Sequence, residues 1–290
     1  MSHPLYEFHQ DPGLSEPVLL VALEGWIDAG GGAASAAETI LASGEQIPVA
    51  TFNSDTLLDH RARRPIMHLV DGVNTGLTWP TIRLDETWDR EGRDVLFLHG
   101  PEPDHNWPSF AKAVIELAEG FEVTEVYGLG AYPAPVPHTR PVQLASTASS
   151  HDMAQRVGFI RGTLEVPAGV AAAIEAQAAE IGMSALGLWA QVPHYAAAMP
   201  YPAAAVRLID GLFEVAGLRF DHGELDAEVE TIRDRLDELV ANSDENQELV
   251  HQLEIHVDQS EPDPEDGGIE LRSGDELAEE FERFLREQDD

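Results

Sequence analysis

Residues 18–32 read VLLVALEGWIDAGGG, and they give the clearest indication of the fold class. Its first six residues are apolar and have the length of a buried strand. Three glycines, Gly30, Gly31 and Gly32, then lead into residues 33–41, which have the alanine-rich composition of a helix. A buried strand, a tight turn and a helix in succession are typical of an α/β sheet whose strands are covered by helices.

The same alternation of strands and helices continues to about residue 220. The other predicted strands are residues 48–52, 66–70, 77–84, 95–99, 125–131, 142–145 and 186–192. The other predicted helices are residues 107–119, 151–157, 170–181 and 203–216. Residues 77–84 contain Pro80, which lacks a backbone N–H, so we expect an edge strand there. The pattern predicts a mostly parallel sheet with helices on both faces.

The C-terminal quarter differs from the rest in charge. Residues 1–220 hold 27 acidic and 12 basic residues, whereas residues 221–290 hold 26 acidic and 5 basic ones. We therefore expect a main domain at 1–220 and an acidic helical extension at 221–290, with a flexible linker at about 258–272. Its helices are too short to be stable alone, so they dock on the main domain, on each other or on a partner. The first helix carries a narrow apolar seam, which consists of Leu225, Val229, Ile232, Leu236 and Leu239.

Within that extension, a second short helix is predicted around residues 249–253. A third is predicted to begin at Ser273, where Glu276 completes a capping box. Two heptads of apolar residues also leave open a coiled-coil seam between copies of the chain.

The composition excludes several classes of function. A net charge of −36 argues against nucleic acid and against anionic membrane surfaces as partners. The absence of cysteine excludes disulfides, thiolate zinc sites and a cysteine nucleophile. The sequence shows no signal peptide, no transmembrane run of about 18 apolar residues, and no cofactor or metal motif. We therefore expect a cytoplasmic protein without a cofactor or a metal.

The glycine turn after the first strand is a candidate ligand site. Ligands of open α/β sheets bind at the carboxyl ends of strands, and a glycine turn before a helix exposes backbone N–H groups to an anion. Gly30, Gly31 and Gly32 suit that role, with Asp28 as a candidate catalytic residue. The alternative is that the glycines permit a tight strand-to-helix crossing and that Asp28 caps the helix.

The tripeptide Val-Pro-His occurs after two predicted strands, at residues 136–138 and 192–194. If both strands are parallel and central, His138 and His194 converge on one rim as candidate catalytic residues. Arg140 is then placed to bind a carboxylate or a phosphate. The alternative is that each histidine ends its strand by bonding to loop backbone. A rim position predicts that His138→Ala leaves the fold intact.

Two further polar segments stand out. His99 ends a predicted strand and begins an exposed loop with Glu102 and Asp104, so it is a candidate ligand-binding residue. The only basic cluster lies at residues 61–64, where Arg61, Arg63 and Arg64 either bind an anion or pair with the acidic tail of the same or a neighbouring chain. The spacing of these groups matches no metal signature.

Several segments together resemble the proteasome assembly chaperone 2 family, in its bacterial, mainly actinobacterial branch. They are EGWIDAGGGAA at 24–34, LLDHRARRP at 57–65, HGPEPDHNW at 99–107, YGLGAYPAPVPHTRP at 127–141, GLWAQVPHYAAAMPYPAA at 187–204 and SGDELAEEFERFLRE at 273–287. The resemblance implies a three-layer α/β/α domain of the phosphorylase/hydrolase-like type with a helical C-terminal addition. It also implies a homo-oligomer, with a trimer among the forms of its relatives, and proteasome subunits as partners.

Some bacterial members are labelled as ATP-grasp superfamily proteins. Lys112 is the only lysine here, which leaves few ways to contact nucleotide phosphates. Chaperones of this kind dock a C-terminal hydrophobic-Tyr-X tail into the proteasome, and this sequence ends Glu-Gln-Asp-Asp. That departure argues against direct docking by such a tail.

The sequence thus supports two functions of different classes. The first is a non-enzymatic protein-binding or assembly factor that acts as a homo-oligomer, because no recognisable catalytic set is present. The alternative is a hydrolase or transferase acting on a small anionic or amide substrate at the carboxyl-terminal rim of the strands.

Overall fold

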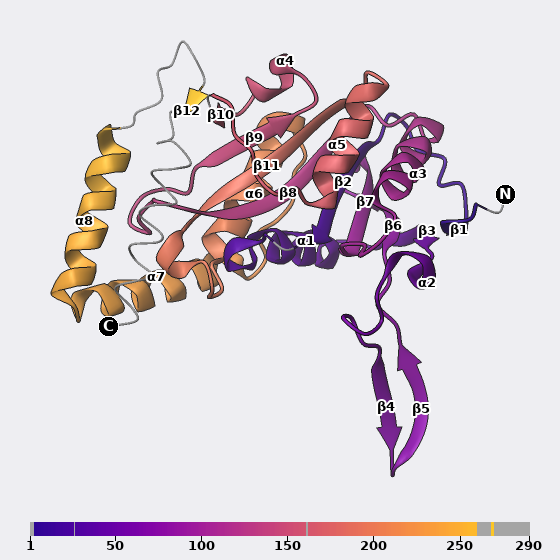
Figure 1. The fold of residues 1–290 in the computed structure, drawn as a ribbon, viewed down its shortest axis with the longest axis horizontal. Helices are drawn as coiled ribbons and strands as arrows, with labels where there is room; N and C mark the ends of the chain where they lie inside the picture. The colour runs from indigo at the N-terminus through magenta and orange to yellow at the C-terminus, as the bar shows by residue number, and fades with distance from the viewer. Residues whose placement is uncertain (1–2, 26, 161, 260–267, 270–290) are drawn as a thin grey trace.

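The centre of the molecule is a parallel sheet. A computed structural model of the chain describes residues 3–25, 27–160, 162–259 and 268–269. The central strands are parallel neighbours, as the sequence predicts, and they follow one another across the sheet (Figure 1). They are β7 (Asp94–Pro101), β2 (Val18–Glu24), β8 (Glu125–Ala134) and β11 (Ser184–Pro193).

Shorter strands extend this sheet on both sides. Beside β7 lie β6 (Arg83–Trp88), β3 (Ile47–Phe52) and β1 (Tyr6–Phe8), each antiparallel to its inner neighbour. Beside β11 lies the antiparallel β9 (Leu144–Ala148), followed by β10 (Phe159–Ile160) and β12 (Gly268–Ile269). The order of the described strands is therefore β1-β3-β6-β7-β2-β8-β11-β9-β10-β12.

Helices cover both faces and complete three layers, which confirms the predicted fold class. One face carries α1 (Gly32–Ala42) and α6 (Pro202–Ala216), and the other carries α3 (Trp107–Gly120) and α5 (Val170–Glu180) (Figure 1). Alternate residues of β2 enter the two cores: Leu20 belongs to the α1 and α6 side, and Leu19 to the α3 and α5 side. Burial on both faces explains why β2 is a continuous apolar run rather than an alternating one.

Short helical segments mark the connections. The α-helical ones are α2 (Ser54–Leu57) and α4 (His151–Ala154), and the 3-10 turns are η1 (Ala29–Gly31) and η2 (His194–Ala196). Asn53 caps α2, because its side chain accepts a hydrogen bond from the N–H of Thr56 at 3.1 Å.

A two-stranded hairpin projects away from the body (Figure 1). It consists of β4 (Ile66–Val70) and β5 (Val73–Thr78), which pair antiparallel. The strand predicted at residues 77–84 is therefore wrong: β5 ends at Thr78, β6 begins at Arg83, and Pro80 lies between them. Proline cannot donate to a strand ladder, so the chain leaves the hairpin there and enters the sheet afterwards.

The acidic extension forms two described helices, α7 (Leu225–Ala241) and α8 (Asp244–Gln259). Leu225 and Leu236 of the predicted seam are buried in the same hydrophobic core as α6, while Leu239 is exposed. Val250 and Leu253 are buried on α8. The helices thus dock within the chain. The helix predicted from Ser273 and most of the predicted linker lie outside the described residues.

Candidate functional site

The two Val-Pro-His segments lie at one edge of the sheet. β8 and β11 are parallel neighbours in which Pro193 lies opposite Ala134, so both strands end at the same rim. Tyr195 follows His194 and lies between the two histidines. Its ring centroid is 5.8 Å from that of His138 and 5.4 Å from that of His194, both edge to face. The structure therefore brings these two predicted site residues together around a tyrosine.

His138 is buried rather than exposed on that rim. Its side chain is 1% exposed and is held from both sides. The Tyr195 hydroxyl accepts the backbone N–H of His138 at 2.8 Å and lies 2.7 Å from Nδ1. The other ring nitrogen, Nε2, lies 3.1 Å from Oδ1 of Asp237 on α7.

Burial raises the pKa of Tyr195 above its ordinary value, so its hydroxyl stays protonated near neutrality. The hydroxyl is also committed to His138 by two hydrogen bonds. Neither property is that of an activated nucleophile. The arrangement fixes the loop after β8 against α7.

Arg140 is paired with α8 instead of facing open solvent as an anion clamp. Its Nε and Nη2 donate to the two carboxylate oxygens of Asp258, both at 2.8 Å, and Nη1 donates to Glu254 at 3.1 Å. The pKa of Arg140 is raised above its ordinary value, mainly by hydrogen bonding to Asp258. Thr139 also donates to Glu254, at 2.6 Å. The guanidinium fork is thus already filled by carboxylates of the same chain.

Asp28 caps α1. Its two carboxylate oxygens accept the N–H groups of Ala33 and Ala34, at 2.8 and 3.0 Å. Burial raises the pKa of Asp28, although both backbone hydrogen bonds oppose that change. This is the geometry of the capping alternative, and a catalytic role for Asp28 stays a prediction.

The glycine turn packs tightly against the start of α6. Gly30 and Gly31 both have a φ of +64°, which suits glycine, and a Cβ at Gly30 would lie 2.5 Å from Cβ of Tyr201. A Cβ at Gly32 would lie 2.8 Å from Cβ of Ala204. The N–H of Gly30 donates to Ala197 at 2.8 Å, and the N–H of Gly31 donates to Asp28 at 3.0 Å. Both N–H groups are therefore bonded within the chain, where the turn before α1 meets α6. Their use as an anion site stays a prediction.

His99 belongs to a different part of the sheet. On β7 it faces β6, where its Nε2 lies 2.7 Å from Oδ2 of Asp85. Arg83 donates to the same carboxylate, whose side chain is fully buried. Burial raises the pKa of Asp85, but the hydrogen bonds from His99 and Arg83 outweigh it and hold that pKa below its ordinary value. The structure therefore does not bring His99 to the rim of His138 and His194.

The described part of the chain shows neither a candidate metal site nor a candidate membrane-spanning helix. Its histidine, aspartate and glutamate side chains form no group of three that could hold a metal ion. Likewise, no helix in the described ranges has both the length and the apolar character to cross a membrane. At the rim, His138 and Arg140 join the loop after β8 to α7 and α8.

The partners of these residues had no signal in the sequence. Asp237, Glu254 and Asp258 belong to acidic helices, where no local signal separates a pairing carboxylate from a solvated one. The hairpin, in contrast, was not predicted although a signal for it is present. Asp71-Gly72 between two apolar runs is the strongest short-range signal of a hairpin, and both residues have a positive φ, of 49° and 82°.

Comparison with known proteins gives the family. The profile of the PAC2 family matches residues 22–240, which include most of the sheet, the helices on its two faces and nearly all of α7. The chain belongs to the PAC2 family. A comparison with curated proteins gave no match.

Solved PAC2-like structures share this fold. A Mycobacterium tuberculosis protein of unknown function is 33% identical, with a TM-score of 0.81, over 89% of this chain and 93% of that one. A protein of unknown function from Corynebacterium glutamicum is 30% identical, with a TM-score of 0.82, over 88% and 97%. The proteasome-assembly chaperone homologue of Mycobacterium tuberculosis is 31% identical, with a TM-score of 0.74, over 80% and 99%. This PAC2 family protein is thus similar to a chaperone homologue over most of its length.

Proposed function

We propose that this PAC2 family protein is an assembly factor that binds other proteins, acts as a homo-oligomer in the cytoplasm and has proteasome subunits as partners. The observation that carries the proposal is the hairpin of β4 and β5. The likeness to a proteasome-assembly chaperone homologue supports the choice of partner.

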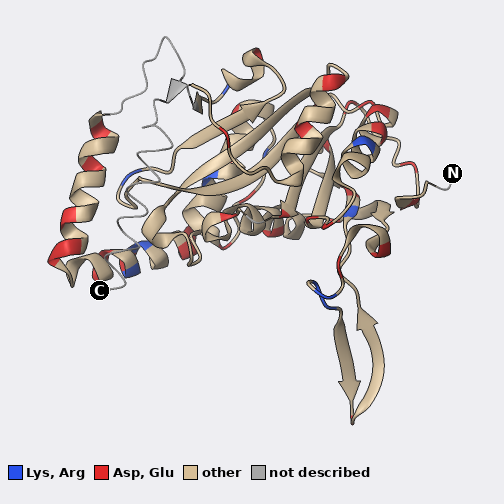
Figure 2. Cartoon of the chain, in the orientation of Figure 1, with Lys and Arg blue, Asp and Glu red and all other residues tan. Residues whose placement is uncertain are grey.

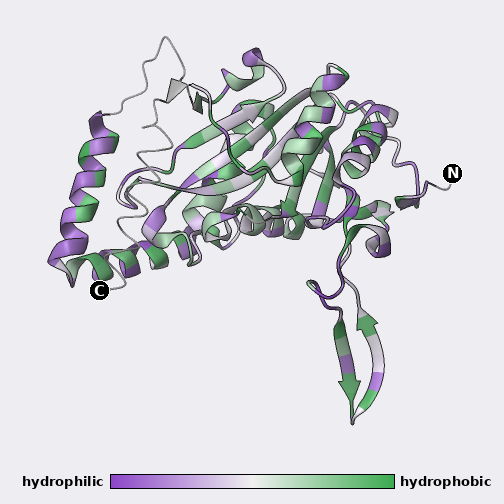
Figure 3. Ribbon diagram, in the orientation of Figure 1, coloured by the Kyte–Doolittle hydropathy of each residue, from purple (hydrophilic) through white to green (hydrophobic). Residues whose placement is uncertain are grey.

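The hairpin exposes apolar side chains, and its two strands form a sheet separate from the main one. Ile66 is 65% exposed, Val73 63% and Val70 58%. Figure 3 shows β4 as mostly hydrophobic, whereas β5 is hydrophobic at its two ends and pale or hydrophilic between them. An isolated two-stranded hairpin is marginally stable in water, and an exposed apolar patch is typical of a protein interface. We infer that the hairpin packs against another polypeptide.

The base of the hairpin carries positive charge, which is complementary to an acidic surface. Arg61 and Arg64 are exposed there, and the same region is basic in Figure 2, whereas α7 and α8 are strongly acidic. In a chain with a net charge of −36, such a cluster is complementary to a second copy of the chain. This complementarity supports the homo-oligomer.

The enzyme alternative has less support from the geometry. A hydrolase or transferase at the strand rim would need His138, Arg140 and Asp28 to face a substrate. Each of them is instead hydrogen bonded within the chain, to Tyr195 and Asp237, to Glu254 and Asp258, and to the start of α1. The proposal therefore favours binding over catalysis.

The proposal is tested by affinity purification of the tagged full chain from its own cells, with mass spectrometry of the co-purified proteins. The test variant replaces the three hairpin residues Ile66, Val70 and Val73 by serine. The matched control replaces Leu164 and Val166 by serine, because these residues are 49% and 65% exposed on a loop far along the chain. Light scattering on the purified proteins measures the number of copies per particle.

We expect proteasome subunits to co-purify with the full chain and with the loop control, and to be lost with the hairpin variant. We also expect the particle mass of that variant to fall to the mass of a single chain. A monomeric wild-type protein would contradict the homo-oligomer. Recovery of the same partners with both variants would contradict the role of the hairpin, and recovery of no proteasome subunit would contradict the choice of partner.

A further inference from the structure

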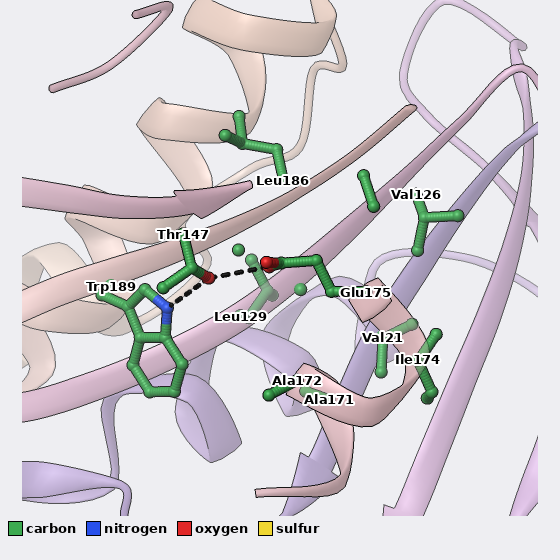
Figure 4. A pocket seen from close by; sticks show the side chains of 13 residues that line it. Val21, Val126, Leu129, Thr147, Ala171, Ala172, Ile174, Glu175, Leu186 and Trp189 are labelled. Carbon is green, nitrogen blue, oxygen red and sulfur yellow. Dashed lines mark hydrogen bonds between the residues drawn. The ribbon is translucent and has the colours of Figure 1, made fainter. Parts of the chain in front are cut away.

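A small recess lies on the opposite side of the molecule from α7, between α5 and the strands β8 and β11 (Figure 4). Its walls are apolar, with Val21, Val126 and Ile174 among them. Its cavity has a volume of about 20 Å³. That volume suits one group of the size of a water molecule.

One carboxylate enters this recess within a fixed chain of hydrogen bonds. The indole N–H of Trp189 donates to Oγ1 of Thr147 at 3.1 Å, and the Thr147 hydroxyl donates to Oε2 of Glu175 at 2.7 Å. Figure 4 shows the three side chains converging from β11, β9 and α5. An ionised carboxylate offers about four acceptor positions, and Thr147 uses one of them. Glu175 is thus oriented and keeps the capacity to accept a donor from a ligand.

Two glycines make the arrangement sterically possible. A Cβ at Gly187 would lie 2.6 Å from Oγ1 of Thr147 and 3.1 Å from Nε1 of Trp189. A Cβ at Gly130 would lie 2.4 Å from the indole ring of Trp189. Any larger residue at these positions would displace the threonine or the indole. The strands therefore leave room for this polar group on an otherwise apolar sheet face.

We propose that this recess binds the ammonium group of a primary alkylamine, with Glu175 as its counter-ion and Trp189 as its aromatic wall. An ammonium group has the size that the cavity holds, and it donates hydrogen bonds to a carboxylate. The methylene stem of the amine would extend out of the recess, and an indole attracts a cation near its ring. The net charge of −36 favours cations at the surface of this chain.

The electrostatics of Glu175 agree with a cationic ligand. Burial raises the pKa of Glu175 above its ordinary value, and the hydrogen bond from Thr147 opposes that effect only in part. A bound cation would offset the cost of ionising this partly buried group. The amine is either a free alkylammonium ion or the tip of a lysine side chain of another protein, and both present the same chemistry.

The test is NMR of the indole N–H of Trp189 in the full-length protein, assigned with the variant W189F. The probes are n-butylammonium, N-acetyl-lysine-methylamide and the neutral n-butanol, all at constant ionic strength. We expect n-butylammonium to shift the resonance saturably, with a dissociation constant of about 1 to 10 mM, and n-butanol to bind at least about tenfold more weakly. Tighter binding of the lysine derivative than of butylammonium would assign the site to a protein side chain, and the reverse to a free amine.

The variant E175Q removes the counter-ion while keeping the shape of the side chain. We expect it to weaken butylammonium binding at least about tenfold. E180Q is the matched control, because Glu180 is exposed on the same helix and pairs with Gln177. T147V provides a second variant that releases Glu175 without touching it. Equal binding of butylammonium and butanol, or unchanged binding by E175Q, would overturn the proposal, and neither result depends on the hairpin or its partners.

Discussion

His138 and Asp237 join two parts of the chain that are 99 residues apart. Nε2 of His138 lies 3.1 Å from Oδ1 of Asp237, which links the loop after β8 to helix α7. Tyr195 holds the opposite side of the same imidazole. The acidic extension is therefore anchored on a buried histidine of the main domain.

We predict that His138→Ala destabilises the protein. The side chain is 1% exposed, so its removal leaves a cavity and removes one of the two hydrogen bonds that Tyr195 makes with residue 138. The expected loss is about 2 to 4 kcal/mol in the free energy of unfolding, measured by urea denaturation. This replaces the expectation, drawn from a rim position, that the fold stays intact.

His105→Ala is the control for this experiment, because His105 is exposed at a loop. We expect it to change the free energy of unfolding by less than about 0.5 kcal/mol. Equal stability of the two variants would show that the buried network contributes nothing.

A second prediction separates two glycines that share the same left-handed φ. Gly30 and Gly31 both have a φ of +64°, but only a Cβ at Gly30 meets Tyr201, whereas a Cβ at Gly31 has nothing within 4 Å. Gly31→Ala should cost about 1 to 2 kcal/mol, which is the cost of the left-handed conformation. Gly30→Ala should cost about 1 to 3 kcal/mol more, because it also forces α1 and α6 apart.

Thermal unfolding of the two alanine variants measures this difference directly. Since both residues are in the left-handed region with the same φ, the difference reports mainly the close approach of the turn to α6. Equal midpoints for G30A and G31A would refute the steric explanation.

The third prediction concerns the attachment of α8. Arg140 forms a bidentate pair with Asp258 and a further contact with Glu254. Arg140→Ala should therefore increase amide hydrogen exchange in α8 several-fold and leave β2 unchanged, because opening of α8 does not require opening of the central sheet.

Arg207→Ala is the matched control for α8. It removes an exposed ion pair with Glu214 that lies within α6, so exchange in α8 should not change. This experiment also tests the proposed division into residues 1–220 and 221–290. If β2 and α8 gained exchange together in R140A, the two regions would form one cooperative unit.

The fourth prediction is a pH dependence at Asp85. Its pKa is held below the ordinary value of 3.8, because hydrogen bonds from His99 and Arg83 outweigh the effect of burial. A carboxyl group with a lowered folded-state pKa contributes stability above pH 3.8, and that contribution is lost as the pH falls through the lower pKa. The difference in unfolding free energy between wild type and D85N should therefore shrink on acidification.

Denaturation of both proteins at a series of pH values from about 6 to about 3 checks this sign. D55N controls for the loss of one negative charge, since the Asp55 side chain is 90% exposed. A difference between wild type and D85N that grows toward low pH would show that the sign is wrong.

The fifth prediction concerns salt. A net charge of −36 repels itself, and α7 and α8 add like charges along two neighbouring helices. Raising NaCl from about 20 to about 200 mM shortens the screening length, so the thermal midpoint should rise. Sucrose of equal osmolarity is the control, and a midpoint that is flat in salt would contradict the prediction.

Much of the fold could be predicted from local pattern. The central strands β2, β7, β8 and β11 are buried on both faces, so each is a short continuous apolar run in the sequence. β6 escaped prediction because its buried residues include Asp85 and Glu86, and charged residues do not signal a buried strand. Their burial depends on partners from other strands, such as His99 for Asp85.

The candidate site was predictable only in part. Repetition of Val-Pro-His pointed to His138 and His194, and the parallel register of β8 and β11 does place both at one rim. Their partners could not be found, because Asp237 and Asp258 are two among many carboxylates of similar context. The recess at Glu175 gave no motif, since its members come from three separate elements.

Local sequence pattern was enough to predict the central strands with the helices that cover them, the two-sided burial of the central sheet and the acidic character of the C-terminal quarter. These follow from periodicity and composition, which act over a few neighbouring residues. Three features follow from long-range packing alone: His138 is buried beneath α7, the guanidinium of Arg140 is bound by carboxylates of α8, and Glu175 enters a recess beside Trp189. Each of these contacts joins residues distant in the chain, and the register of the sheet and the packing of helices on it determine which side chains meet.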